Sequence, residues 1–226
     1  MTWPGDMPSG PQSAEEKAYR ILRSRIDLSR LPKHSRDVTE RVIYASADFD
    51  YATDLVCDEE ALATAVAALA GGAAVVADTA MAAAGITGCP VVCKIGEQLT
   101  ARLARTASIS TAAAAVRLAF GEVGPGAVWL VGCEPAALTE ILTRGVEPAF
   151  VIGMPVGFIG AAEAKDALRA SGIRSVSNVS EKGGAAVAAA ALEALLRSAM
   201  TVSGSRAGGG AGAEGVSPGP GDGAAT

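Results

Sequence analysis

Short hydrophobic runs alternate with helical patterns through the middle and C-terminal parts of the chain. The runs are rich in β-branched residues and predict strands at 74–78, 91–95, 127–132, 149–156 and 175–179. The segments after them predict helices at 79–84, 97–120 with a break, 134–144, 160–171 and 184–199. This alternation predicts a single α/β domain with a mostly parallel sheet of about five strands and helices on both faces.

Helices are also predicted before the first of these strands. Ser13 and Glu16 have the spacing of a capping box and predict a helix to about Ile26. Asp37 and Glu40 repeat that spacing and predict a second helix at 37–47. Three acids at 58–60 open a third helix, which is expected to stop at the glycine pair 71–72.

Both ends of the chain have a composition that disfavours folding. Residues 1–12 hold three prolines and two glycines, and residues 203–226 hold nine glycines and two prolines. Such segments bury too little apolar surface to offset the entropy of ordering. We therefore expect disordered segments at 1–12 and 202–226 and a folded domain at 13–201.

Composition narrows the class of partner. Of 226 residues, 24 are acidic and 19 are basic, so the net charge of -5 disfavours a general nucleic-acid binder. A locally basic pocket for an anionic small molecule remains compatible with this charge. The apolar segment 183–200 contains Glu193 and Arg197, which indicates a packed helix rather than a membrane span. With no secretory signal pattern at the start, we expect a cytoplasmic protein that binds neither membrane nor nucleic acid.

Cysteine and histidine residues are few and scattered. The four cysteines form no CxxC pair, so we expect reduced, buried thiols and no metal site. His34 is the only histidine and lies in a polar stretch that is expected to be a loop before a helix. A solvated loop histidine is therefore favoured over a nucleophile-activating one.

Three loops at the carboxyl ends of the predicted strands are candidates for a ligand site, because ligands of open α/β sheets bind there. Asp78 ends the first strand, where it is either a ligand contact or the N-cap of the next helix. Segment 151–165 runs from a strand through Pro155, Gly157 and Gly160 into a helix with Lys165. Its glycines allow backbone N–H groups to approach an anion, although they also suit simple packing.

Segment 180–184 is the third of these loops and carries Lys182 before Gly183. Lys182 could point toward the same crevice and, with Lys94 and Arg41, clamp several carboxylates. The alternative for each of these cations is an ordinary solvated charge.

The residues in several stretches resemble the precorrin-8X methylmutase family of cobalamin biosynthesis, which includes the cobalt-precorrin-8 enzymes. The resemblance covers about residues 13–198. It rests on YRILRSRIDL at 19–28, RVIYASAD at 41–48, Asp78 with Met81 and GIT at 85–87, and above all VIGMPVGFIGAAEAK at 151–165 and VSNVSEKGG at 176–184.

This resemblance implies an isomerase that moves a methyl group from ring carbon 11 to carbon 12 of a corrinoid, giving hydrogenobyrinic acid or its cobalt-containing equivalent. It implies no cofactor, a homodimer, and a pocket near the subunit interface. Together with the loops, it places substrate-binding residues at Ala18, Arg41, Asp78, Thr87, Lys94, Thr111, Pro155, Gly157, Phe158, Gly160, Lys165, Lys182 and Gly183.

The chain departs from the family pattern at several pocket positions. Tyr44 stands where the family has the histidine that is taken to donate a proton, so it is the candidate catalytic residue. Thr111 stands in place of an arginine, Ala18 in place of a serine, and Glu134 in place of a small residue. The unperturbed pKa of tyrosine is ~10 and that of histidine ~6.5, so Tyr44 is the weaker acid. The alternative reading is an impaired member that binds a corrinoid or partners an active paralogue.

Overall fold

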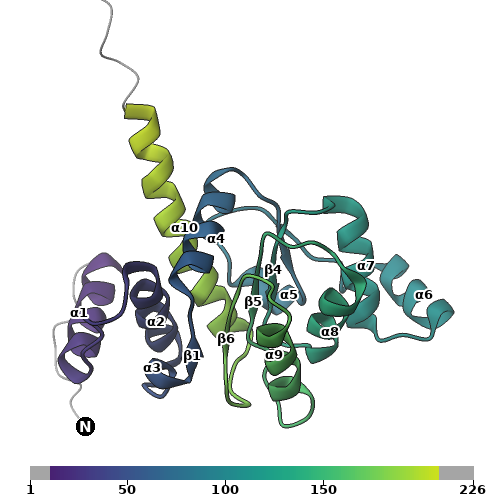
Figure 1. Ribbon diagram of the computed structural model, residues 1–226, viewed down its shortest axis with the longest axis horizontal. Coiled ribbons are helices and arrows are strands. Elements are labelled where there is room, and N and C mark those ends of the chain that lie inside the picture. Colours follow the sequence, from purple (N-terminus) through teal and green to yellow (C-terminus); the bar gives the residue numbers. More distant parts are fainter. Residues whose placement is uncertain (1–10, 209–226) are drawn as a thin grey trace, which may run out of the picture.

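The computed structural model describes residues 11–208, which form a layered α/β domain around one sheet (Figure 1). The strands run in the order β1-β6-β5-β4-β2-β3. Their bounds are β1 Leu55–Val56, β2 Val75–Ala77, β3 Val91–Val92, β4 Val128–Val131, β5 Phe150–Gly153 and β6 Ser175–Asn178. Strands β2 to β6 are parallel, whereas β1 pairs antiparallel with β6. The mostly parallel sheet is therefore confirmed.

Two strand predictions need correction. The expected strand at 91–95 is only the two-residue β3, and the chain after it leaves the sheet. Strand β1 was not predicted, because two residues are too short to show an alternating pattern.

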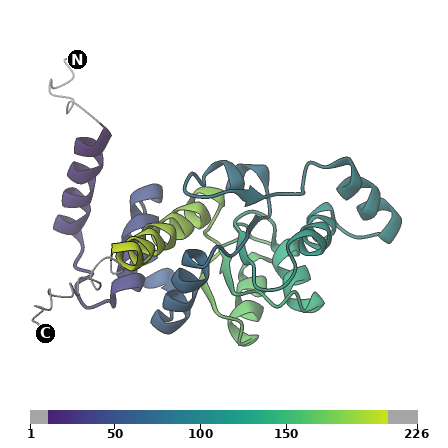
Figure 2. The ribbon, with the colours of Figure 1, turned by 90° about the horizontal axis from the view of Figure 1, so that it is seen from above.

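Helices cover both faces of the sheet, as predicted. The helices are α1 Pro11–Arg25, α2 Lys33–Ser46, α3 Tyr51–Asp54, α4 Glu59–Ala70, α5 Ala80–Ala84, α6 Gln98–Ala107, α7 Thr111–Val123, α8 Pro135–Arg144, α9 Ala161–Ala170 and α10 Ala185–Gly208. Helices α4 and α10 pack on one face with α2 outside them, and α7, α8 and α9 pack on the other. Seen from above, α1 lies at one end of the molecule and α6 at the opposite end (Figure 2).

Strand β4 shows why both faces must be covered. Val128 and Leu130 belong to the core on the α10 side, whereas Trp129 and Val131 belong to the core on the α7 side. All four side chains are almost completely buried. Successive side chains of a strand point to opposite faces, so an uninterrupted apolar strand requires helices on both.

Helix α10 is the central helix of the larger core. Within the described part of the chain, its segment 185–202 is the one that is long and apolar enough to cross a membrane, but 67% of it is buried inside the domain. Its alanines allow close packing: a Cβ on Gly132 would lie 2.9 Å from the Cα of Ala185. The prediction of a packed helix is confirmed.

The start of α2 corrects the prediction for His34. The helix begins at Lys33 rather than at Asp37, so His34 lies in its first turn and not in a loop. Glu59 of α4 accepts hydrogen bonds from the backbone N–H groups of His34 and Ser35, both at 2.9 Å. A helix start needs acceptors for its free N–H groups, and here a carboxylate distant in sequence supplies them.

The ends of the folded unit also differ from the expected bounds. Helix α1 begins at Pro11, before the proposed capping box, and α10 continues to Gly208. The predicted disorder of residues 1–10 and 209–226 lies outside the described residues.

Candidate functional site

Asp78 holds a turn at the carboxyl edge of the sheet, and it is not the N-cap of the next helix. Its Oδ2 accepts hydrogen bonds from the backbone N–H groups of Gly132, Cys133 and Glu134, at 3.1, 2.7 and 2.9 Å. The N-cap of α5 is instead Thr79, whose hydroxyl accepts from Ala82. Asp78 therefore fixes the turn between β4 and α8 through Oδ2, and its Oδ1 accepts a long hydrogen bond from the Thr79 hydroxyl at 3.4 Å.

The other two predicted loops are joined at the same edge. The backbone N–H of Gly157 donates to the carbonyl of Glu181 at 3.0 Å, and that of Gly184 donates to the carbonyl of Met154 at 3.0 Å. A Cβ on Gly183 would lie only 2.2 Å from the Met154 carbonyl oxygen, so only glycine fits there. Gly183 thus lies against Met154 and Pro155, and Gly157 against Glu181, so the two loops meet, whereas Gly160 lies near Pro135 at the start of α8.

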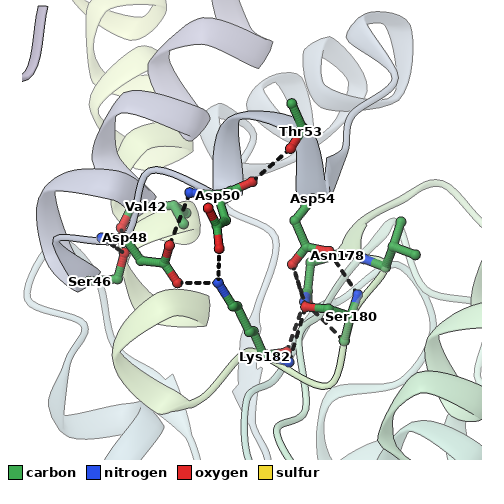
Figure 3. Close-up of polar contacts among 10 residues, drawn as sticks. Val42, Ser46, Asp48, Asp50, Thr53, Asp54, Asn178, Ser180 and Lys182 are labelled. Atoms are coloured by element: carbon green, nitrogen blue, oxygen red, sulfur yellow. Dashed lines mark hydrogen bonds and ion pairs between the residues drawn. The ribbon is translucent and has the colours of Figure 1, made fainter. Parts of the chain in front are cut away.

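Lys182 does not point freely into a crevice. Its Nζ lies 2.7 Å from Asp48 and 2.6 Å from Asp50, both in the connection after α2 (Figure 3). The hydrogen bond to Asp48 raises the pKa of Lys182, and the same contact lowers that of Asp48. Lys182 therefore fastens the end of α2 to the loop that precedes α10.

Lys165 also differs from the prediction of a cation that faces the crevice. Its side chain is completely buried, and its Nζ bonds to Asn178 and to two backbone carbonyls of the loop at 180–184. Burial lowers the pKa of Lys165 to about 8. The predicted free pocket charge is thus an internal group beneath the loop.

Tyr44 lines a cavity of about 190 Å³ between α2, the end of α5 and α10. Arg41, Gly85, Ala186 and Glu193 also line it. The side chain of Tyr44 is 38% exposed, and the Arg41 guanidinium carbon lies 5.2 Å from the centre of its ring. Because Ala186 follows the loop at 180–184, this cavity adjoins the carboxyl edge of the sheet.

Arg41 and Ala18 connect α1 to this cavity. Arg41 donates to Glu15 of α1 at 2.7 Å, and Glu15 also binds Arg197 of α10 at 3.1 Å. Ala18 lies half-buried on α1, next to Tyr19, which stacks on Tyr44. Arg41 therefore lies at Tyr44 but is already paired, and Ala18 lies on the helix whose Tyr19 stacks on Tyr44.

Glu193 is a site residue that the sequence reasoning missed. It accepts hydrogen bonds from the backbone of Thr87 at 2.7 Å and of Gly88 at 3.2 Å, and it lines the Tyr44 cavity. A lone acid in an alanine-rich helix is a weak signal, and here it marks where a loop is attached. The predicted residue Thr87 lies in that loop.

Lys94 and Thr111 lie on the β3 side of the sheet, away from the loop that carries Lys182. Lys94 follows β3, binds Glu97 at 2.8 Å and Glu122 at 2.5 Å, and has a pKa raised to about 12 by these contacts. Four strand spacings separate β3 from β6, or about 19 Å. Thr111 is exposed at the start of α7. Each cation of the predicted clamp, Lys94, Lys182 and Arg41, is thus paired with carboxylates of the chain itself.

Comparison with known proteins agrees with this arrangement of fold and loops. Residues 13–198 match the family described as precorrin-8X methylmutase. The chain is 35% identical to a precorrin-8X methylmutase from Sinorhizobium sp., over 80% of this chain and 92% of the relative. It is also 35% identical to a cobalt-precorrin-8 methylmutase from Salmonella typhimurium, over 82% of this chain and 94% of the relative.

Solved structures show the same likeness. The precorrin-8X methylmutase of Thermus thermophilus superimposes with a TM-score of 0.77 at 30% identity, covering 85% of this chain and 98% of that one. A precorrin-8X methylmutase related protein has a TM-score of 0.71 at 28% identity, covering 79% and 98%. The chain therefore belongs to the precorrin-8X methylmutase family, a family of isomerases of cobalamin biosynthesis.

Proposed function

We propose that this protein catalyses the methyl shift from ring carbon 11 to carbon 12 of precorrin-8X or cobalt-precorrin-8, with Tyr44 as the proton donor. The observation that carries the proposal is the position of Tyr44. Tyr44 lies exposed in a cavity next to the loops at 154–160 and 180–184. These loops belong to residues 13–198, which match the family. The shift is intramolecular: one carbon–carbon bond breaks at ring carbon 11 and another forms at carbon 12, so no cofactor is consumed.

The chemistry asks two things of the protein. The first is to bind a ring that carries carboxylates around its periphery. The loops at 154–160 and 180–184, which are hydrogen-bonded to each other, form a fixed surface against which the ring can lie. The second is to lend the ring a proton during the shift and to take one back afterwards, because substrate and product are isomers. Tyr44 is exposed in the cavity and so can reach the ring for both transfers. The cavity of about 190 Å³ is smaller than a corrin ring, so we place the ring over the open face beside it.

We further propose a homodimer in which each chain contributes to the pocket of its partner. Phe158 and Ile159 are 94% and 90% exposed, and a second copy would bury these apolar side chains. Lys94 and Thr111, which lie away from the loop that carries Lys182 in one chain, would then reach the partner's pocket. Sedimentation at micromolar concentration should give twice the mass of the chain, and Phe158→Ser with Ile159→Ser should shift the protein toward a monomer.

We also propose that the enzyme acts in the cytoplasm. All four cysteines are free, and reduced thiols are typical of that compartment. Fractionation of the cells that make the protein would test this directly.

Conversion of precorrin-8X tests the activity. Purified protein should produce hydrogenobyrinic acid, followed by its absorbance spectrum, at a rate that scales with enzyme concentration. Absence of product above background over hours at high enzyme concentration would overturn the proposal.

A further inference from the structure

Lys165 is a buried cation for which the proposed reaction has no direct use. Its side chain is 0% exposed, and its partners within residues 11–208 are an amide oxygen and two backbone carbonyls rather than a carboxylate. Its Nζ donates to Asn178 Oδ1 at 3.1 Å, to the carbonyl of Lys182 at 2.8 Å and to the carbonyl of Ser180. An ammonium group has three N–H donors, and here each has one acceptor. Two of the three acceptors belong to the loop at 180–184, which we name the Lys182 loop.

Neighbouring groups attach the same loop from a second side. Asp54 of α3 accepts from the backbone N–H of Ser180 at 2.8 Å and from its hydroxyl at 2.7 Å (Figure 3). Asn178, itself fully buried, donates to Asp54 at 2.9 Å and to the carbonyl of Lys182 at 2.8 Å. The loop is therefore held by Lys165 from below and by Asp54 from the side.

The Lys182 loop reaches the Tyr44 cavity by two routes. At its end, Gly184 leads into the first turn of α10, where Ala186 lines the cavity. In the middle of the loop, Lys182 forms an ion pair with Asp48, which lies four residues after Tyr44. A shift of this loop would therefore move both the floor of the cavity and the end of the helix that carries Tyr44.

From these contacts we propose that Lys165 is a positioning residue for the methyl shift, because its ammonium group holds the Lys182 loop where that loop orients α10 and α2 around Tyr44. The inference rests on the proposed function for its link to the substrate. The link from Lys165 to the loop stands independently of it.

The proposal makes the charge of Lys165 important. Loss of one proton leaves two N–H donors for three acceptors, two of which are loop carbonyls, so the three contacts can no longer all be made. The charged groups that face Lys165 are Asp54 of α3, Arg169 and Asp166 of α9, and Glu181 of the loop itself. Burial outweighs the attraction of the three carboxylates, and the pKa of Lys165 falls to about 8. The loop should therefore loosen at mildly alkaline pH.

Hydrogen exchange, first of the wild-type protein, tests the structural link. Protection of the amides at 178–184, corrected for intrinsic exchange, should fall about tenfold between pH 7 and 9.5, the effect of losing a hydrogen bond to a charged group. Amides at 128–131 in the buried strand β4 serve as the internal reference. Lys165→Met should show the lowered loop protection already at pH 7, and equal loop protection of wild type and Lys165→Met at pH 7 would overturn the proposal.

Ligand binding tests the link to function. The dissociation constant of hydrogenobyrinic acid, measured by absorbance, should rise about tenfold over the same pH range in the wild type. Its carboxylates are ionised throughout that range, so its own charge does not change. Lys165→Met should bind weakly already at pH 7 and show no further pH dependence. Lys17→Met, which removes a charge from the exposed face of α1, should match the wild type.

The two measurements separate failure of this inference from failure of the proposed function. If the wild type binds no hydrogenobyrinic acid at either pH, the proposed function fails, and loop exchange alone decides whether Lys165 holds the loop. If the wild type and Lys165→Met bind with the same affinity and the same pH profile, Lys165 does not position the site.

Discussion

The ring of Tyr44 stacks on the ring of Tyr19, with the ring centres 5.1 Å apart and the planes 11° from parallel. Tyr44 belongs to α2 and Tyr19 to α1, so the stack joins the outermost helix to the helix that carries the proposed proton donor. Arg41 approaches Tyr44 at 5.2 Å, and Arg23 approaches Tyr19 at 5.6 Å. The ring of Tyr44 is therefore held in place while its edge remains open to solvent.

The Tyr44 hydroxyl is expected to carry the proton transfer. Tyr44→Phe keeps the ring and its stack but removes the proton, and general-acid assistance is typically worth about 10²-fold or more in rate. Turnover of precorrin-8X should fall by about that factor, while Tyr19→Phe should change it little.

Tyr44→His tests the same position in the opposite direction. Histidine is the stronger acid at neutral pH, so turnover should rise above that of the wild type. If wild type and Tyr44→His are both inert but bind hydrogenobyrinic acid, the chain would be a corrinoid-binding member without catalysis. Equal turnover of wild type and Tyr44→Phe would remove Tyr44 from the mechanism.

The stack between Tyr19 and Tyr44 should contribute to stability. Tyr19→Ala loses an aromatic pair and buried ring area, so we expect the free energy of unfolding to fall by about 1–3 kcal/mol in urea titrations. Tyr19→Phe keeps the ring and loses only its contact with Arg41, so it should lie within about 0.5–1.5 kcal/mol of the wild type. A Tyr19→Ala protein as stable as the wild type would show that α1 is not held by this contact.

Gly183 and Gly157 offer a matched pair of substitutions at the carboxyl edge. Both have strongly positive φ values, +149° and +141°, so alanine at either position costs about 1–3 kcal/mol of backbone strain. Only at Gly183 would the new Cβ also meet a backbone carbonyl, that of Met154 at 2.2 Å. Gly183→Ala should therefore be clearly more destabilising than Gly157→Ala in denaturant unfolding. Equal losses would mean that the two loops can separate without cost.

Asp54 is expected to make stability sensitive to acid. Burial alone would raise its pKa, but four hydrogen bonds from Asn178, Val179 and Ser180 lower it below the ordinary value of 3.8. A carboxyl group with a lowered folded-state pKa adds stability above pH 3.8, which is lost as the pH falls through the folded-state value. The free energy of unfolding of Asp54→Asn should be about 1–3 kcal/mol lower than that of the wild type at pH 7, and it should depend less on pH in acid. Asp166→Asn, at an exposed ion pair, should behave like the wild type.

Lys165 should make the free energy of unfolding depend on pH in the alkaline range. Its folded-state pKa of about 8 lies below the ordinary 10.5, so the unfolded chain binds more protons between these values. The free energy of unfolding of the wild type should therefore rise with pH in this window relative to Lys165→Met, by up to about 1 kcal/mol per pH unit. A parallel pH dependence of the two proteins would contradict a lowered pKa. The contribution of Lys165 to global stability would thus increase over the same pH range in which the Lys182 loop loosens.

Local patterns in the sequence were sufficient for the main elements of the fold. The apolar strands, the helix breaks at glycine and the packed alanine-rich helix are all present, because periodicity and glycine content act over a few residues. The same local signals placed Gly157 and Gly183 at one edge of the sheet, where the loops that carry them are joined. Strand β1 and the start of α2 were missed, because each depends on a partner far along the chain.

The roles of the charged side chains were decided only by the tertiary structure. Lys165, Lys182 and Asp78 have the residue types and positions of ligand-binding groups, yet their partners are Ser180, Asp48 and the turn at 132–134. The energy of a charge depends on its burial and on the acceptors within about 3 Å of it, and residues distant in sequence supply both. The sequence by itself thus determined the layers and the family, and folding determined which polar groups remain available to a ligand.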